Sequence, residues 1–282
     1  MFYCLVLQAG WLIYRVRAEL KDSIPGSTAS EGQTNDKPDP WWSEYVDEYR
    51  RIDQSELPSD TVFGVSFDTY TIEVQRYLRY LQGKVEALGG KVVRARLSSD
   101  NGIEGAVESA KVVLGLPKEY RFLAVINASG NGARDLVKDE NLYPIRGQIV
   151  KVQGVADYCT TRLGHHKNDR TGVMPRPGEN ITVIGVTVEP DIGNTEVDPK
   201  MIPQLLNAAK PFCPELLNKQ GEFTVIETGV GLRPGRKGGA RVEMEHINDL
   251  TIVHAYGVAG AGYQNSIGLS RKILRLLQNH PS

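Results

Sequence analysis

The spacing of apolar and polar residues predicts alternating helices and strands. Apolar positions recur at helical spacing over residues 70–88, with Asp68 and Thr69 as candidate caps, and the pair Gly89-Gly90 then ends the pattern. Residues 91–97 are rich in strand-forming side chains. Further strands are predicted at residues 61–67, 122–128, 144–152, 174–177, 181–188 and 250–253, with a helix opening at Asp198-Pro199 and a last helix over residues 267–277.

Residues 122–128 are the clearest buried strand that the pattern predicts, and they lead directly into S-G-N-G-A-R-D at 129–135. That turn is like the dinucleotide fingerprint G-x-G-x-x-G, but Asp135 stands where the third glycine would be. An ordinary tight strand-to-helix turn is an equal alternative. Residues 157–170 are polar and predict a loop. The whole pattern predicts an α/β (α+β) fold with a large mixed sheet over residues 170–230.

Composition and charge exclude several classes of protein. The chain has 282 residues, 40% of them hydrophobic, and a formal net charge of −1, so nothing favours nucleic acid or a membrane surface as partner. Three scattered cysteines give no disulfide framework. The apolar start, residues 1–14, is too short to span a bilayer, and residues 15–40 are polar and predict a linker or disordered segment. The adjacent His165 and His166 lack a third ligand, so no metal is expected.

Candidate chemistry lies between residues 227 and 264. Arg233, Arg236, Lys237 and Arg241 fall within nine positions among glycines, and arginine suits a bidentate carboxylate. A solvated basic loop is the plain alternative. A glycine-rich turn at 257–262 then precedes the last helix, and a helix N-terminus favours anions.

The ordered motifs G-V-G-L-R-P-G-R-K-G-G-A-R-V-E and V-H-A-Y-G-V-A-G-A-G-Y-Q closely resemble the C-terminal signature of the D-amino acid oxidase family, FAD-dependent enzymes that include D-aspartate oxidases. The segments N-A-S-G-N-G-A-R and P-I-R-G-Q are similar to that family as well. The resemblance implies FAD as cofactor, and it implies oxidative deamination of a D-amino acid by oxygen to a 2-oxo acid, ammonia and hydrogen peroxide.

The resemblance also assigns candidate residues. It implies that Arg233 and the backbone of Gly260 bind the substrate, that the cofactor performs the reaction without a catalytic side chain, and that Arg236 and Lys237 are exposed rim charges. The candidate cofactor contacts are Leu97, Ser129, Gly130, Arg241, Ala259, Gly260, Ala261, Gly262, Tyr263 and Gln264.

The sequence departs from the family's pattern in two respects. No G-x-G-x-x-G unit precedes residue 129, so the N-terminal dinucleotide-binding unit is expected to be missing and the FAD-binding layer incomplete. Gly172 and Thr187 stand where two pocket tyrosines are usual, and Val188 stands where D-aspartate-preferring relatives often have a basic residue. A catalytically inactive remnant that does not hold FAD is therefore the alternative function.

These observations divide the chain at residue 40. Residues 1–40 are expected to be a non-matching segment, and residues 41–282 an oxidoreductase domain. In that domain, remnants of the FAD-binding part lie at about 61–140 and 250–282, with the substrate sheet at about 141–249. The sequence leaves open whether the chain forms a homodimer. A peroxisomal or cytoplasmic location is expected, although the C-terminus N-H-P-S is not the S-K-L type.

Overall fold

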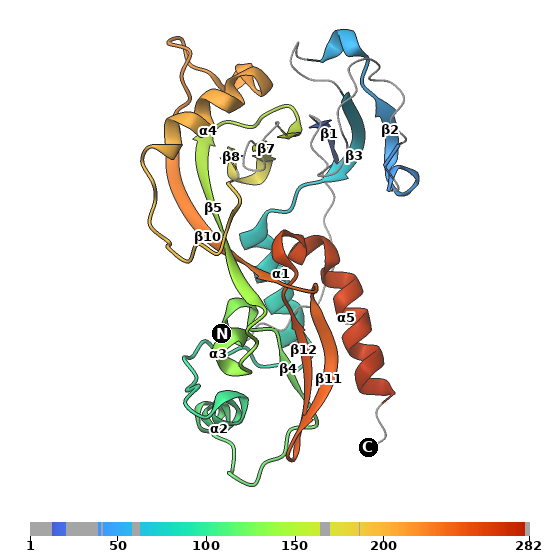
Figure 1. The fold of residues 1–282 in the computed structure, drawn as a ribbon, viewed down its shortest axis with the longest axis vertical. Coiled ribbons are helices and arrows are strands. Elements are labelled where there is room, and N and C mark those ends of the chain that lie inside the picture. Colours follow the sequence, from blue (N-terminus) through green and yellow to red (C-terminus); the bar gives the residue numbers. More distant parts are fainter. Residues whose placement is uncertain are drawn as a thin grey trace.

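The fold is built on two β-sheets joined by long strands (Figure 1). The structure is a computed structural model. It describes residues 39–40, 42–57, 63–163, 170–185 and 187–279, and the backbone alone of residues 13–20. Within that part of the chain, the elements confirm the mixed α/β class expected from the sequence.

Sheet A, the larger sheet, has nine strands in the order β10-β5-β8-β7-β6-β1-β3-β2, with β9 paired to β5. Most neighbours are antiparallel, but β1 and β6 run parallel, so the sheet is mixed as expected. The strands are β1 (Ile13–Leu20), β2 (Asp47–Arg51), β3 (Phe63–Tyr70), β5 (Leu142–Gln153), β6 (Cys159–Leu163), β7 (Arg170–Arg176), β8 (Ile181–Gly185), β9 (Glu189–Pro190) and β10 (Val225–Arg236).

One face of sheet A carries a hydrophobic core. Helix α4 (Met201–Ala209) packs on this face, where Val150, Val173 and Ile184 are fully buried beside its Leu205. These residues come from adjacent strands at paired register positions. Because side chains alternate along a strand, their neighbours in sequence lie on the opposite face.

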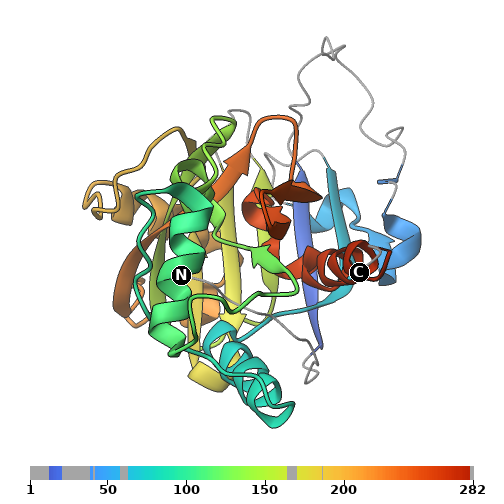
Figure 2. The same ribbon diagram turned by 90° about the horizontal axis from the view of Figure 1, so that it is seen from below.

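Sheet B has three strands in the order β11-β12-β4, where β11 is Arg241–Ile247, β12 is Leu250–Tyr256 and β4 is Val125–Asn127. Helices α1 (Val74–Ala87), α2 (Gly102–Leu114) and α5 (Gly262–Gln278) surround this end of the molecule (Figure 2). None of the helices in the described part of the chain is long and apolar enough to cross a membrane.

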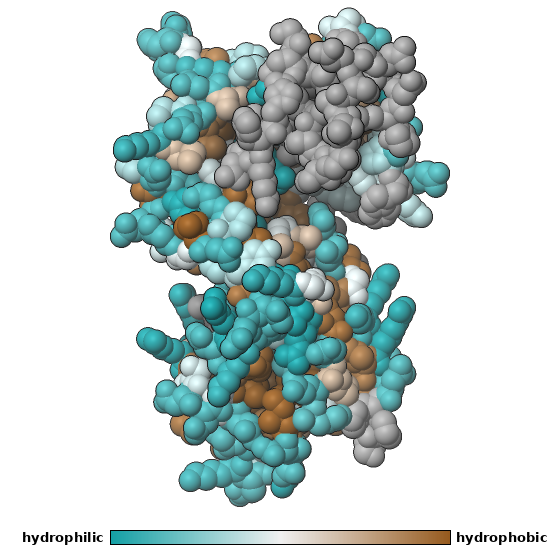
Figure 3. Space-filling model, viewed as in Figure 1, coloured by the Kyte–Doolittle hydropathy of each residue, from teal (hydrophilic) through white to brown (hydrophobic). Residues whose placement is uncertain are grey.

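Strand β4 pairs with β12 on one side, and no described strand lies on its other side. Ile126 is consequently 37% exposed and Leu123, just before the strand, is 89% exposed. Apolar surface is visible on the lower half of the molecule (Figure 3). The prediction of a buried strand over residues 122–128 was therefore wrong in length and in burial.

Several other predicted elements need correction. The N-terminal segment contains β1 between β3 and β6, because residues 13–20 alternate apolar and polar side chains in a strand pattern. Residues 91–97 form no strand, since no strand of sheet B pairs with them. Asp68 and Thr69 belong to β3, and helix α1 begins after Glu73. The predicted loop at 157–170 contains β6, while His165 and His166 lie outside the described residues.

Candidate functional site

Most of the basic glycine-rich stretch is a strand, β10, whose C-terminal end reaches the junction of the two sheets (Figure 1). Arg233 lies three residues before that end. On β5, Gly147 pairs with Gly231 of β10. A methyl group on Gly147 would collide with the Arg233 guanidinium, so the glycine makes the space that this side chain occupies. The Arg233 guanidinium also donates a hydrogen bond of 3.3 Å to the backbone oxygen of Thr187.

Arg233 lies half-buried, and the structure gives it no carboxylate partner among the described residues. Burial lowers the pKa of Arg233 below its ordinary value, and the positive charge of Arg170 lowers it further. A cation in this position is stabilised by an anion that enters from outside. A carboxylate can accept two parallel hydrogen bonds from the guanidinium.

Two glycine-containing turns adjoin Arg233. The 3-10 turn at Gly130–Gly132 follows β4 and is fixed to β10, where the Asn131 side chain donates a 3.2 Å hydrogen bond to the oxygen of Leu232. The second turn, Ala259–Ala261, follows β12, and a methyl group on Gly260 would lie 3.6 Å from Cδ of Arg233. The structure thus brings together Ser129, Gly130, Arg233, Ala259, Gly260 and Ala261 from the predicted site.

Helix α5 begins at Gly262 directly after the second turn and has no side-chain cap at its N-terminus. Its first backbone N–H groups are therefore donors without an intrahelical partner. Tyr263 and Gln264 are exposed on the first turn of this helix, and the Tyr263 ring lies 6.4 Å from that of Tyr77.

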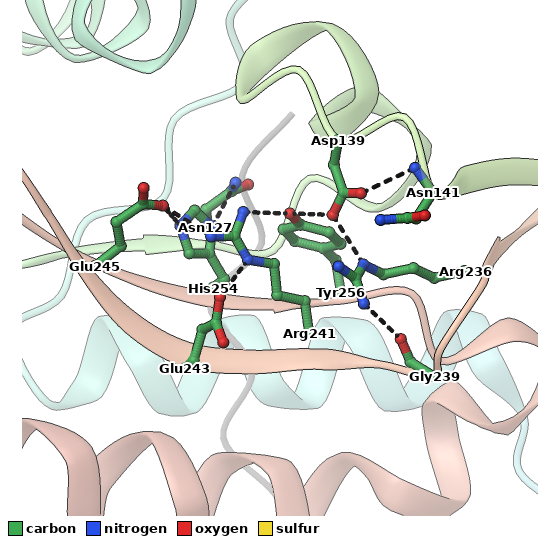
Figure 4. Close-up of polar contacts among 10 residues, drawn as sticks. All are labelled: Asn127, Asp139, Asn141, Arg236, Gly239, Arg241, Glu243, Glu245, His254 and Tyr256. Carbon is green, nitrogen blue, oxygen red and sulfur yellow. Dashed lines mark hydrogen bonds and ion pairs between the residues drawn. The ribbon is translucent and has the colours of Figure 1, made fainter.

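Arg241 occupies a different environment from Arg233 (Figure 4). Its guanidinium donates hydrogen bonds to Glu243 at 2.6 Å, to Glu245 at 2.8 Å and to the hydroxyl of Tyr256 at 3.1 Å. These three protein acceptors engage three of its nitrogens. Arg241 acts as a structural cross-link between β11 and β12 in this arrangement, and its assignment as a cofactor contact stays a prediction.

The sequence prediction that Arg236 is an exposed rim charge was wrong. Its guanidinium contacts Asp139 at 2.8 Å, where the two side chains are 19% and 4% exposed. Asp139 also accepts hydrogen bonds from the Tyr256 hydroxyl and the backbone N–H of Asn141. Burial alone would raise the pKa of Asp139, but these donors, Arg236 first, hold the pKa below its ordinary value. Lys237, in contrast, is exposed as expected.

A second buried chain of contacts leads from sheet B to the first glycine-containing turn. Asn127 accepts hydrogen bonds from Ser129 through its side-chain oxygen, at 2.7 Å from the hydroxyl. Its amide nitrogen therefore faces Nδ1 of the fully buried His254 at 3.2 Å, so that Nδ1 accepts and carries no proton. Nε2 of His254 then donates to Glu245 at 2.9 Å. The turn at Ser129 is thereby tied to the neutral form of His254.

Other predicted site positions are explained by packing. Leu97 packs against the core cluster that Ile103 and Ile252 form, which is a structural role. Gly172 pairs with Gly185 across β7 and β8, and a side chain at 172 would collide with the Gly185 backbone oxygen. A tyrosine therefore cannot replace Gly172 without a shift of β8. Two neighbours of Arg233 were visible in the sequence only indirectly. Gly147 is the glycine of P-I-R-G-Q, and Thr187 stands where a pocket tyrosine is usual.

Residues 4–276 match the family described as FAD dependent oxidoreductase. The chain belongs to this family. It is 34% identical to a D-aspartate oxidase from Talaromyces thermophilus over 82% of its own length and 59% of the relative's. It is 30% identical to a D-amino-acid oxidase from Schizosaccharomyces pombe over 81% of its own length and 64% of the relative's. The chain thus spans about three fifths of these two relatives.

Solved structures confirm the fold of the FAD-dependent oxidoreductase family. A glycine oxidase from Geobacillus kaustophilus superposes with a TM-score of 0.65 at 17% identity, covering 95% of this chain and 72% of that one. A glycine oxidase from Bacillus cereus gives 0.58 at 19% identity over 86% of this chain and 68% of that one. At this identity the similarity concerns the fold alone. The family match starts at residue 4, whereas the sequence resemblance was expected to begin at about residue 41.

FAD is the cofactor of this family, and the described residues fit it in part. The uncapped start of α5 and the turn at Ala259–Ala261 offer backbone donors to a polar ring edge. No described strand and helix enclose a three-glycine turn of the kind that holds a pyrophosphate. The fit is therefore limited to the side of the site next to Arg233.

Proposed function

We propose that this chain forms the substrate side of an FAD-dependent oxidase that deaminates D-amino acids. The observation that carries the proposal is Arg233, a half-buried cation whose described hydrogen-bond partner is a backbone carbonyl. Relatives named D-aspartate oxidase and D-amino-acid oxidase support the same reaction class.

In the proposed mechanism, Arg233 binds the α-carboxylate of the substrate through two parallel hydrogen bonds. Gly147 leaves room for the guanidinium, and the Thr187 carbonyl restricts its orientation. The backbone of Gly260, which adjoins the Arg233 side chain, accepts a hydrogen bond from the substrate amine. When bound, FAD supplies the acceptor for a hydride and passes the electrons to oxygen. The chain itself contributes orientation and the exclusion of water.

Cofactor contacts are proposed at the turns and at the start of α5: Ser129, Gly130, Ala259, Gly260, Ala261, Gly262, Tyr263 and Gln264. Leu97 is proposed to contact the cofactor through its backbone, which the packing of its side chain does not occupy. Arg241 is a weaker proposal, because its guanidinium already donates hydrogen bonds to Glu243 and Glu245. The divisions at residues 1–40, 61–140 and 141–249 remain predictions, as do a homodimer and a peroxisomal or cytoplasmic location.

Equilibrium dialysis of the chain with FAD tests the cofactor part of the proposal. We expect weak binding, because the described residues offer no site for the pyrophosphate. Dissociation constants in the micromolar range or below would contradict this expectation. Failure to bind at any concentration would favour the alternative of an inactive family member.

A peroxide-coupled assay at saturating FAD tests the reaction. We expect turnover of D-amino acids and none of their L-isomers. Arg233→Ala should lower kcat/KM by roughly 30-fold to several-thousand-fold, since removing one partner of a desolvated charge pair costs about 2–5 kcal/mol. Arg233→Lys should restore little, because a point charge does not reproduce the planar fork. Preference for L-isomers, or unchanged kcat/KM in the alanine variant, would reject the assignment.

A further inference from the structure

The first glycine-containing turn contacts the strand on both sides of Arg233. The Asn131 side chain donates a 3.2 Å hydrogen bond to the backbone oxygen of Leu232. A methyl group on Gly130 would lie 3.7 Å from Cγ of Pro234, so the turn also packs on that proline. The turn therefore adjoins the residue before Arg233 and the residue after it. A displacement of the turn changes the backbone from which the Arg233 side chain extends.

The position of this turn depends on one buried amide, that of Asn127 (Figure 4). Its side-chain oxygen accepts hydrogen bonds from the Ser129 hydroxyl at 2.7 Å and from the Ser129 backbone N–H at 3.3 Å. Its amide nitrogen donates to Nδ1 of His254 at 3.2 Å. A primary amide accepts on one side and donates on the other. Asn127 can therefore hold Ser129 in this way only while Nδ1 of His254 is an acceptor.

Protonation of His254 reverses this requirement, because both ring nitrogens of a histidine cation are donors. Nε2 already donates to Glu245 at 2.9 Å, so the added proton goes to Nδ1 and points at Asn127. Two donors then face each other, and rotation of the amide by half a turn restores a hydrogen bond to the ring. The same rotation aims the NH₂ group at Ser129, whose backbone N–H loses its acceptor. A partly buried donor without an acceptor is unfavourable, so the turn is released.

Several elements surround His254 and set its protonation. Burial lowers the pKa of His254 below its ordinary 6.5, and the charge of Arg241 lowers it further, whereas Glu245 and Glu243 on β11 oppose this shift. The Tyr256 ring stands edge-on, with its centroid 5.7 Å from that of the imidazole. Strand β4 and the turn at Gly130–Gly132 carry no charged residue. The charged residues of α5 are exposed: Arg271, Lys272 and Arg275.

We propose that His254 controls the Ser129 turn through the Asn127 amide. The neutral imidazole holds the amide in the orientation that fixes the turn, and the protonated ring rotates it. Asn127 and His254 are thus positioning residues for Arg233, and carboxylate binding is strongest while His254 is neutral. The inference rests on the proposed function for the role of Arg233, whereas the rotation of the amide requires no ligand.

Calorimetric titration with butyrate at several pH values between about 5 and 8 tests the inference. Butyrate carries one carboxylate and no amine, and affinities are compared for its ionised form. We expect a constant affinity above about pH 6.5 and a loss of about three- to tenfold below it, as hydrogen bonds of the turn are broken. His254→Gln should keep the high affinity at every pH, because a neutral amide can accept from Asn127 and donate to Glu245.

Asn127→Asp separates a positioning role from a purely structural one. A carboxylate has two acceptor oxygens, so it can accept from Ser129 and from protonated His254 at the same time. Its negative charge also favours the cation. We expect this variant to keep its affinity as the pH falls, whereas Asn127→Leu should show the low affinity at every pH. A decline in Asn127→Asp equal to that of the wild type would overturn the proposal.

Nitrogen NMR follows the amide without a ligand or a flavin. We expect Nδ1 of His254 to be unprotonated at neutral pH, and the Ser129 amide signal to shift as His254 titrates in the wild type but not in His254→Gln. An unmoved Ser129 signal, or unfolding of the chain before His254 titrates, would overturn the proposal. A shifting signal in a protein that binds no butyrate would retain the role of His254 at the turn and reject Arg233 as the carboxylate site. Butyrate binding that requires Arg233 but is independent of pH would retain that site and reject the role of His254.

Discussion

Replacing Arg236 by alanine should destabilise the folded chain strongly, although its place in a basic glycine-rich stretch suggested an exposed charge. The guanidinium lies 2.8 Å from a carboxylate oxygen of Asp139, whose side chain is 4% exposed. It also donates to the backbone oxygen of Gly239 at 3.1 Å. The pair connects the end of β10 to the loop after helix α3 (Ala133–Leu136), and through Tyr256 to β12 (Figure 4).

The expected loss of stability in Arg236→Ala depends on the interactions that Asp139 keeps after the substitution. Breaking a buried ion pair by removing one partner costs about 3–5 kcal/mol, because a charge is left buried without compensation. Asp139 would keep the hydrogen bonds from Tyr256 and the backbone of Asn141, and the Arg236 side chain is 19% exposed. We therefore expect the free energy of unfolding to fall by about 2–4 kcal/mol.

Urea denaturation of the wild type and the variant measures the loss. Arg121→Ala is the matched control, because Arg121 also lies 2.8 Å from a carboxylate, that of Asp249, but the two side chains are 76% and 78% exposed. We expect no measurable change in the control. A similar small effect in both variants would refute the argument that burial of Asp139 makes the Arg236 pair important.

Three further outcomes are expected. Burial lowers the pKa of His254 from an ordinary 6.5, so the folded state binds a proton less readily than the unfolded chain. The free energy of unfolding should therefore decline as the pH falls below about 6.5. Urea denaturation at several pH values should show a shallower decline for His254→Gln. Gly147→Ala should weaken butyrate binding about tenfold, because the new methyl group displaces the Arg233 guanidinium. Gly231→Ala is the control, since no atom lies within 4 Å of its added methyl group, and it should leave binding unchanged. Equal affinities of the two variants for butyrate, measured by calorimetry, would contradict this. Thr187→Val should cost about 1–3 kcal/mol in urea, because it leaves the buried N–H of Gln148 without its acceptor, and an unchanged midpoint would count against that contact.

Elements with a strong local pattern could be predicted from the sequence. The strand at residues 250–253, the turn after Gly257 and the last helix are present as β12, the 3-10 turn and α5. The end of α1 at Gly89 follows from its positive φ of 82°, which glycine tolerates. The prediction of a strand at residues 91–97 was wrong, because a strand also needs a neighbouring strand to pair with. Local composition does not show whether such a neighbour is present.

The candidate site, like the fold, could be predicted from the sequence only in part. The turns at Ser129 and Gly260 and the carboxylate-binding role of Arg233 were proposed from motifs, and the structure brings these residues together. The contacts that distinguish one arginine from another could not be predicted. Asp139 is 97 positions from Arg236, and Thr187 is 46 positions from Arg233, so only the folded sheets bring these partners together.

Arg233, Arg236 and Arg241 are the same type of residue in one basic stretch. Their hydrogen-bond partners differ, however, and so does their ability to bind an external anion. Arg236 and Arg241 have carboxylate partners within the chain, so an external anion would have to compete with a charge that is already in place. Arg233 has a glycine beneath its guanidinium and a backbone carbonyl as acceptor, and no described carboxylate competes for it. A ligand carboxylate therefore gains its full interaction energy at Arg233 alone among the three. Carboxylate binding that survives Arg233→Gln and is lost in Arg241→Gln would contradict this argument. The absence of a carboxylate partner within the chain would then be the wrong criterion for locating the substrate.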